Sequence, residues 1–269
     1  PGQIRGKPGI TVRQIVAEPP VVPVRAGERV SFAVDSRRRP YRWDVRRIGA
    51  SRPVTKGLSH AARTLIFRSP RGISGIYLLE LRSGRYHASV PFLVQSQQPS
   101  KLLVVVPTAS WLGVDKIDDD RDGLPNTLDK GGPVEWPRAY TRLPPALAAD
   151  TAPLLIFLDR AGIKYDLTSD IALARSDEPT MANHPGVILA GSLRWVPRPL
   201  ARRLRRYVEA GGRLASFGTE SMRRGVPLGE DDLSQPTQAT PVDPFGARPE
   251  PGAAPRVADD GKTPLPIPA

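Results

Sequence analysis

The sequence predicts two folded domains, a β-sandwich followed by an α/β domain built on a parallel sheet. The first hundred residues hold short alternating polar and apolar segments between turn residues, a pattern typical of antiparallel strands with one buried face. From residue 101 onward, continuous apolar segments alternate with helical patterns, which favours a parallel sheet covered by helices. We place the domains at residues 1–96 and 101–228, with a linker at 97–100 and a tail at 229–269.

The first domain contains six candidate strands of similar length. In the third, Tyr41, Trp43 and Val45 alternate with charged residues, so one face is expected to be buried and the other solvated. Several short strands at this spacing indicate an immunoglobulin-like sandwich. The six segments are Ile10–Val16, Arg29–Val34, Tyr41–Ile48, Thr64–Arg68, Ile76–Leu81 and Ala88–Val94.

The second domain opens with Leu102–Val106, a continuous run of leucine and valine that predicts a strand buried on both faces. A helix is predicted at Ala152–Ala161, with Gly162 as its cap, and another begins near Pro199 and ends at the next glycine pair. The remaining strands are expected at Ile163–Leu167, Val187–Ala190 and Leu214–Phe217. The tail has nine prolines in 41 residues and no apolar periodicity, which predicts either disorder or an extended strap.

The net charge of +12 belongs to one segment of the chain. Residues 1–100 carry 18 Lys+Arg and 5 Asp+Glu, whereas residues 101–269 carry 21 and 22. Nucleic-acid binding would need basic residues interleaved with stacking aromatics, but the arginines mostly alternate with apolar residues, as on solvated strand faces. We therefore expect no nucleic-acid partner, and polyanion binding remains an alternative. No apolar run is long enough for a membrane span.

The sharpest chemical motif is an acidic loop that begins at Asp118. Counting that residue as position 1, the loop has aspartates at positions 1, 3, 5 and 12, glycine at 6 and asparagine at 9. Ca²⁺ takes six to eight oxygen ligands at this spacing, and the glycine permits the sharp turn. The pattern predicts a structural calcium site, with a solvated acidic turn as the alternative; no preceding helix is evident. The expected ligands are Asp118, Asp120, Asp122, the Leu124 carbonyl, Asn126 and Asp129.

Motifs for other chemistry are missing from the sequence. The chain has neither G-x-G-x-x-G nor a P-loop, and without cysteine it has no thiol nucleophile. Ser192 follows a predicted strand, but G-x-S-x-G is absent, so a plain loop serine is favoured. The three histidines are scattered without metal-ligand spacing. We expect each to be a surface residue or a satisfied core residue.

Five segments of the chain follow a pattern found together in one known family. They are Ser69–Tyr77, Lys101–Trp111, Pro153–Asp166, Val187–Gly191 and Tyr207–Gly218. Through them, roughly residues 62–226 resemble the C-terminal region of the large (β) subunit of N,N-dimethylformamidase and its relatives. That resemblance implies a class-I glutamine-amidotransferase-like fold preceded by an immunoglobulin-like domain.

The resemblance also implies an amidohydrolase with one iron held by a tyrosine and two glutamates. The tyrosine is expected just beyond Trp111, where this chain has Val114 and Asp115. One glutamate is expected in Gly191–Trp195, which has no acidic residue, and Glu220 is the only candidate for the other. Iron is therefore not expected, because it needs hard anionic ligands. The missing cysteine likewise excludes glutamine amidotransferase chemistry.

These observations favour a calcium-binding, non-catalytic binding or accessory module. The alternative is a hydrolase of small C–N bonds with a rearranged site at the carboxyl ends of the strands, where ligands gather in open α/β sheets. Since the chain opens at Pro1, we expect it to be a fragment of a longer chain. The sequence identifies no partner; further domains of that chain or copies of itself are the candidates. A calcium site slightly favours an exported or cell-surface protein over a cytoplasmic one. The candidate residues for the hydrolase alternative are Trp111, Ser192, Arg194, Trp195 and Glu220.

Overall fold

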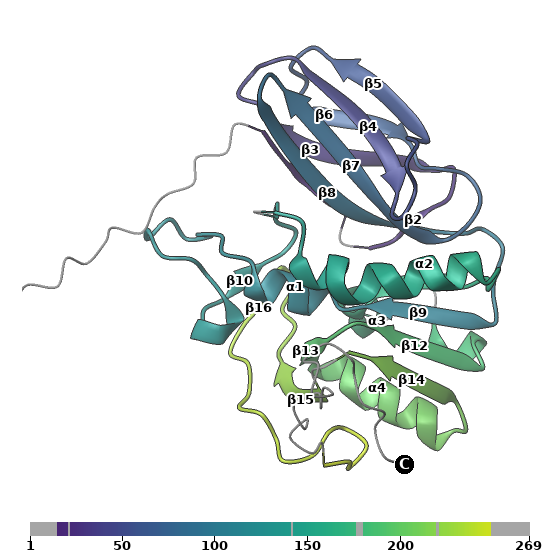
Figure 1. Ribbon diagram of the computed structural model, residues 1–269. Coiled ribbons are helices and arrows are strands. Elements are labelled where there is room, and N and C mark those ends of the chain that lie inside the picture. Colours follow the sequence, from purple (N-terminus) through teal and green to yellow (C-terminus); the bar gives the residue numbers. More distant parts are fainter. Residues whose placement is uncertain (1–14, 21, 141, 176–179, 219–220, 249–269) are drawn as a thin grey trace, which may run out of the picture.

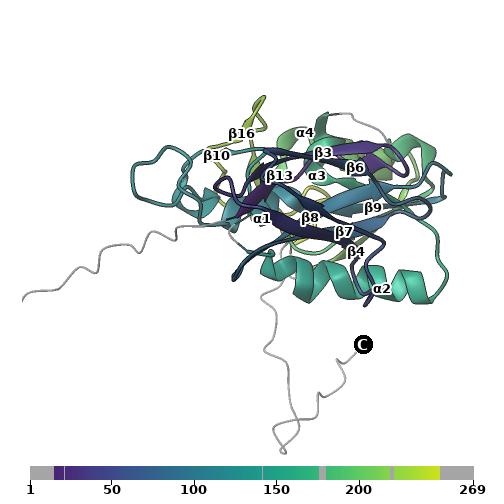
Figure 2. The same cartoon turned by 90° about the horizontal axis from the view of Figure 1, so that it is seen from above.

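The computed structural model describes residues 15–248 except 21, 141, 176–179 and 219–220. Two layers of antiparallel strands form the first domain, and it lies on top of the second (Figure 1). Seen from above, the strands of the first domain overlie the parallel sheet of the second (Figure 2). The chain is therefore a β domain followed by an α/β domain, as the sequence predicts.

The sandwich consists of a three-stranded sheet in the order β1-β3-β6 and a five-stranded sheet in the order β2-β8-β7-β4-β5. Neighbouring strands pair antiparallel except β2 with β8, which are parallel. The strands are β1 (Val16–Glu18), β2 (Val24–Arg25), β3 (Arg29–Asp35), β4 (Tyr41–Arg47), β5 (Thr55–Ser59), β6 (Thr64–Arg68), β7 (Gly75–Ser83) and β8 (Tyr86–Gln95).

Five predicted strands of this domain are confirmed with small shifts at their ends. β3 alternates exposed and buried residues without a break, and Phe32 stacks on Phe67 with ring centroids 5.6 Å apart. The predicted strand Ile10–Val16 lies mostly outside the described residues, and β1 begins at its last residue. β2 and β5 were not predicted. β2 has only two residues, and β5 contains a glycine, so neither gives an alternating pattern.

The second domain is a four-stranded parallel sheet in the order β11-β9-β12-β14. Its central strand β9 is Leu102–Val106, and the others are β11 (Asp166–Ser169), β12 (Gly186–Ala190) and β14 (Arg213–Phe217). The helices are α1 (Thr108–Val114), α2 (Ala152–Arg160), α3 (Asp170–Arg175) and α4 (Arg198–Glu209), with short turns η1 (Leu128–Lys130), η2 (Leu147–Thr151) and η3 (Met181–Asn183).

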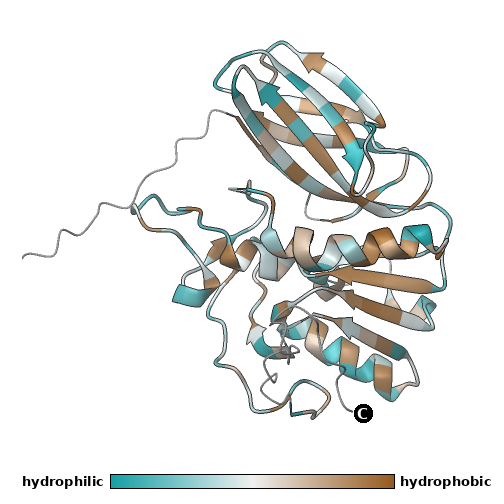
Figure 3. Ribbon diagram, in the orientation of Figure 1, coloured by the Kyte–Doolittle hydropathy of each residue, from teal (hydrophilic) through white to brown (hydrophobic). Residues whose placement is uncertain are grey.

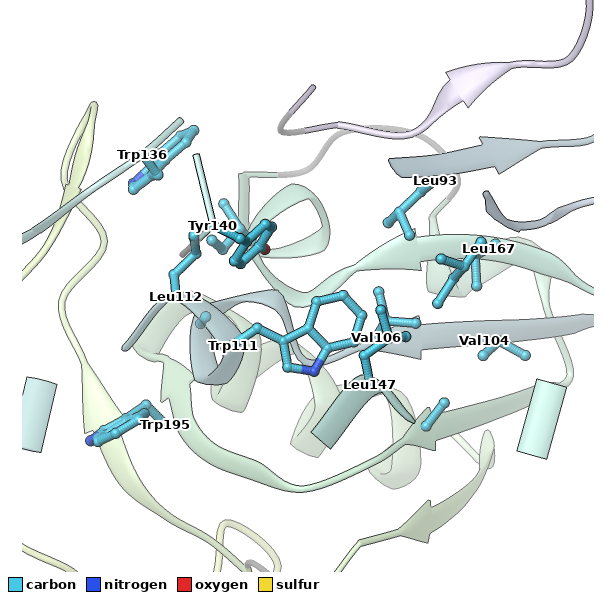
Figure 4. Packing of buried hydrophobic residues seen from close by; sticks show 14 of the residues in the cluster. Leu93, Val104, Val106, Trp111, Leu112, Trp136, Tyr140, Leu147, Leu167 and Trp195 are labelled. Atoms are coloured by element: carbon cyan, nitrogen blue, oxygen red, sulfur yellow. The ribbon is translucent and has the colours of Figure 1, made fainter. Parts of the chain in front are cut away.

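β9 shows why the apolar run predicts burial on both faces. Val104 and Val106 lie in one core cluster with Leu155 of α2, whereas Leu103 and Val105 lie in another with Leu200 and Leu204 of α4. The ribbon coloured by hydropathy shows β9 as an almost uniformly apolar strand (Figure 3). The cluster against α2 also includes Ile76 and Leu93 of the sandwich, so one core continues across the domain junction (Figure 4).

Several local predictions for the second domain are wrong. A helix, α1, does precede the acidic loop; its seven residues include a serine, a threonine and a glycine, which hide the helical period. The strand predicted at Ile163–Leu167 begins at Asp166, because the chain is still in the turn that ends α2, where the amide of Ile163 donates to the carbonyl of Leu158. The parallel pair β13 (Leu193–Pro197) and β15 (Ser221–Val226) was not predicted.

The described part of the tail is an extended strap. Its strand β16 (Asp232–Leu233) pairs with β10 (Val134–Glu135), and Leu233 is fully buried. Further along, the amides of Thr237 and Thr240 donate to carbonyls of β15. Backbone hydrogen bonds thus hold the proline-rich segment against the domain without a core of its own. Among the described residues, no helix is both long and apolar enough to cross a bilayer.

Candidate functional site

The carboxyl ends of the parallel strands are where an α/β sheet usually presents a ligand site. Here β9 runs through Pro107 into α1, whose Trp111 is only 2% exposed. Trp111 packs among Val106, Tyr140 and Leu147, with its ring turned into the core (Figure 4). Trp111 was a candidate for a rearranged active site, but its position is that of a core residue.

β13 covers the same edge of the sheet. Trp195 is fully buried, and the amides of Arg194 and Trp195 both donate to the hydroxyl oxygen of Ser110, at 2.9 and 3.3 Å. The guanidinium of Arg194 lies 4.8 Å from the centre of the Trp195 ring. These contacts fix β13 onto the first turns of α1. Trp195, like Trp111, contributes packing at this edge.

Asp170 is the buried acid at this edge, and sequence reasoning missed it. Its carboxylate accepts hydrogen bonds from the Thr108 hydroxyl at 2.6 Å, the Ala109 amide at 3.1 Å and the Ile171 amide at 2.9 Å. Burial raises the pKa of this carboxyl to about 6, because those bonds only partly offset its loss of water. Asp170 therefore joins the start of α1 to the end of β11.

Ser192 lies directly after β12 and its hydroxyl donates to Asp150 at 3.1 Å. A serine nucleophile needs a base that can take its proton, yet His184 precedes β12 and so lies at the opposite end of the sheet. There it is a satisfied core residue, as predicted, with its ring nitrogens 2.8 Å from Asp166 and 2.7 Å from the Thr180 carbonyl. Ser192 and His184 are not brought together.

The positions at which the resemblance implies iron ligands do not hold the tyrosine and glutamate expected there. Iron held by hard anionic ligands needs oxygen donors aimed at one point. At the first position Val114 has no donor and Asp115 has a carboxylate in place of a phenol, and Gly191–Trp195 has no acidic residue and contributes the guanidinium of Arg194, a cation. The backbones of Gly191 and Gly218 also approach so closely that an added Cβ on Gly218 would lie 2.5 Å from Gly191. Glu220 lies outside the described residues.

The acidic loop follows α1. Asp118, Asp120 and Asp122 are exposed, and each offers a carboxylate oxygen within 4.8 Å of the other two. The loop turns through Arg121 and Gly123, both at positive φ, and the Gly123 amide donates to Asp118 at 3.0 Å. Three of the six predicted ligands thus converge.

The other two side-chain ligands already have partners. The Asn126 side chain hydrogen-bonds the Asp120 carboxylate, and its amide oxygen accepts from the Asp119 amide at 2.7 Å. The Asp129 carboxylate accepts from the Arg194 guanidinium at 2.5 Å. To bind an ion as the ligand at position 12, the Asp129 carboxylate would have to release the Arg194 guanidinium. Leu124, whose carbonyl stands at position 7, has a side chain that is 55% exposed.

A buried ion pair fastens the acidic loop to the domain, and it too was missed by sequence reasoning. Arg138 and Asp119 have side chains only 5% and 6% exposed, and their charged atoms are 2.6 Å apart. Arg138 also donates to the carbonyls of Leu112 and Asp115 at the end of α1. Burial raises the pKa of Asp119 and the charge of Arg138 opposes that rise. A lone arginine in a loop gives no sequence signal of such a role.

Comparison with known proteins bears on the family of this chain. No curated protein matches the chain. The family described as N,N-dimethylformamidase beta subunit-like, C-terminal, matches residues 62–244, from just before β6 into the strap. That match covers more than half of the sequence and includes the whole parallel sheet, α1 and the acidic loop. The chain therefore belongs to the N,N-dimethylformamidase beta subunit-like family, through that family's C-terminal region.

Proposed function

We propose that this chain is a non-catalytic binding or accessory member of its family, stabilised by calcium. The observation that carries the non-catalytic part is the packing at the carboxyl edge of the sheet. Trp111, Trp195 and Asp170 are buried there. The Asp170 carboxylate accepts a hydrogen bond from Thr108 of α1, and the Trp195 amide donates one to Ser110 of α1. A hydrolytic site needs open space beside a nucleophile or metal-bound water; among the described residues, the buried side chains of Trp111 and Trp195 pack at this position instead.

The calcium part rests on the acidic loop. Three converging carboxylates repel one another, and a bound cation relieves that repulsion. Asp118, Asp120 and Asp122 lie within reach of one ion, while the buried pair of Asp119 and Arg138 holds the loop against α1. Loops of this kind with weak affinity work where calcium is abundant. We therefore favour an exported or cell-surface location.

At the level of fold, we propose that the first domain is immunoglobulin-like and the second glutamine-amidotransferase-like. The two packed antiparallel sheets support the first assignment. The parallel order β11-β9-β12-β14, with helices on both faces, supports the second. The architecture carries no amidotransferase chemistry with it, since the sequence has no cysteine.

Thermal unfolding with and without calcium tests the proposal. At calcium tenfold above its dissociation constant, binding contributes about 1.4 kcal/mol, or a Tm rise of roughly 3–6 °C for a chain of this size. We expect that rise with millimolar Ca²⁺ and none with Mg²⁺. Asp120→Ala should abolish it, and Asp231→Ala, which removes an exposed carboxylate outside the loop, should leave it intact.

The alternatives predict different results. If calcium leaves the Tm of the wild-type protein unchanged, the loop is a solvated acidic turn. Stoichiometric iron that is lost on Glu220→Ala, together with turnover of small amides, would establish the amidohydrolase alternative. Polyanion binding by the basic sandwich would appear as heparin affinity that weakens steeply with salt.

A further inference from the structure

A pocket separate from the acidic loop lies at the junction of the two domains. It has a volume of about 750 Å³, within the range of sites for small molecules, which often form at domain interfaces. The sandwich contributes the loop around Arg71 and Ser74, and the α/β domain contributes the turn from Gly162 to Tyr165 after α2. The linker with Gln97 closes a third side.

Arg47 and Asp159 join the domains inside this pocket. Their charged atoms are 2.7 Å apart, with side chains 11% and 25% exposed. The same guanidinium nitrogen donates to the Ser74 carbonyl at 2.6 Å and to the Tyr165 hydroxyl at 3.1 Å. Tyr165 in turn donates to Asp159 at 3.2 Å. Burial raises the pKa of the Tyr165 hydroxyl, so it remains a neutral donor.

The residues that line the pocket carry more positive charge than the Asp159 carboxylate neutralises. All the lining residues are described. Among them Asp159 is the one carboxylate, whereas Arg47 and the exposed Arg71 and Lys164 are cations. Nε and Nη1 of Arg47 are withdrawn from solvent without a hydrogen-bond acceptor. Since Asp159 offsets one cation, Arg71 and Lys164 leave an excess of two positive charges. One of them comes from each domain.

Two backbone segments border these two cations. An added Cβ on Gly27, whose φ is +81°, would lie 3.5 Å from the Arg71 side chain, so this turn is in ordinary contact with that side chain. At the end of α2, the amides of Gly162 and Ile163 already donate to the carbonyls of Asp159 and Leu158. These bonds reduce the negative potential that a free helix C-terminus would direct into the pocket.

From these contacts we infer that the junction pocket binds a small dianion, a dicarboxylate or a phosphate group, held between Arg71 and Lys164. A ligand that contacts both domains stabilises their junction, so binding raises the Tm. Charge-assisted hydrogen bonds from arginine and lysine are the contacts that favour carboxylate and phosphate. This inference is independent of the calcium proposal, since no residue is shared.

The test is thermal unfolding of the calcium-free protein, titrated separately with succinate and inorganic phosphate at constant ionic strength. We expect at least one of the two to raise the Tm at or below about 10 mM. The double variant Arg71→Gln/Lys164→Gln should weaken that response at least tenfold. The variant Arg202→Gln/Lys130→Gln has the same net charge and changes exposed cations elsewhere, and it should respond like the wild-type protein.

The two probes also distinguish the two chemical classes of anion. A response to succinate alone assigns dicarboxylates, and a response to phosphate alone assigns phosphate compounds. Equal weakening in both double variants, which would show only nonspecific attraction, overturns the inference. No response to either probe up to about 50 mM overturns it as well. The Tm of each variant without anion, compared with that of the wild-type protein, verifies that the junction still forms.

Discussion

Replacing Arg138 with methionine removes the cation that holds the acidic loop. The variant leaves the Asp119 carboxylate, 6% exposed, beside an apolar side chain in place of a guanidinium 2.6 Å away. Breaking a buried pair by removing one partner costs about 3–5 kcal/mol. The carbonyls of Leu112 and Asp115 lose a donor at the same time. For a chain of this size, the loss corresponds to a Tm lower by roughly 6–20 °C.

The assay is urea unfolding at pH 7 and at pH 4, with Arg202→Met on the exposed face of α4 as the control. The control should cost no more than about 0.5 kcal/mol. Burial already raises the pKa of Asp119, and losing Arg138 raises it further. The carboxyl is protonated as the pH falls through that value, so the defect should shrink at pH 4. A defect no larger than that of the control, or one that grows at low pH, would refute the role given to this pair.

Two further predictions concern the parallel sheet. His184→Ala removes the imidazole 2.8 Å from the buried Asp166 carboxylate and should cost about 2–3 kcal/mol in urea unfolding, because a buried charged group loses a hydrogen-bond partner; a cost below about 1 kcal/mol would contradict the importance of this contact. Asp170, with its pKa raised to about 6 in the folded state, binds its proton more tightly when folded. Its contribution to stability should therefore decrease by about 1 kcal/mol from pH 5 to pH 7, a dependence that Asp170→Asn should remove. An unchanged pH profile in that variant would contradict the raised pKa.

Local patterns were enough to predict most of the architecture. The apolar run at Leu102–Val106 became the central strand with both faces buried, because a strand between two helical layers has no polar face to show. Alternation at Tyr41–Arg47 likewise gave a strand with a buried face. Gly162 has φ +68° after α2, as a helix cap requires.

Long-range partners could not be predicted from those patterns. Asp129 matches position 12 of a calcium loop, yet it pairs with Arg194, which lies 65 residues further along the chain. Asp170 looks like an ordinary acid at the start of a helix until β9 places Thr108 beside it. The sequence offered Trp111 and Trp195 as site candidates because they follow strands, but only the packing shows that they belong to the core.

Metal analysis of the purified chain, in equilibrium dialysis against millimolar calcium, tests the central claim most directly. The account predicts about one calcium ion per chain, lost on Asp120→Ala, and no stoichiometric iron. One iron per chain would contradict the non-catalytic assignment. Absence of calcium from the wild-type protein, at millimolar calcium in equilibrium dialysis, would contradict the structural role of the loop at Asp118, Asp120 and Asp122.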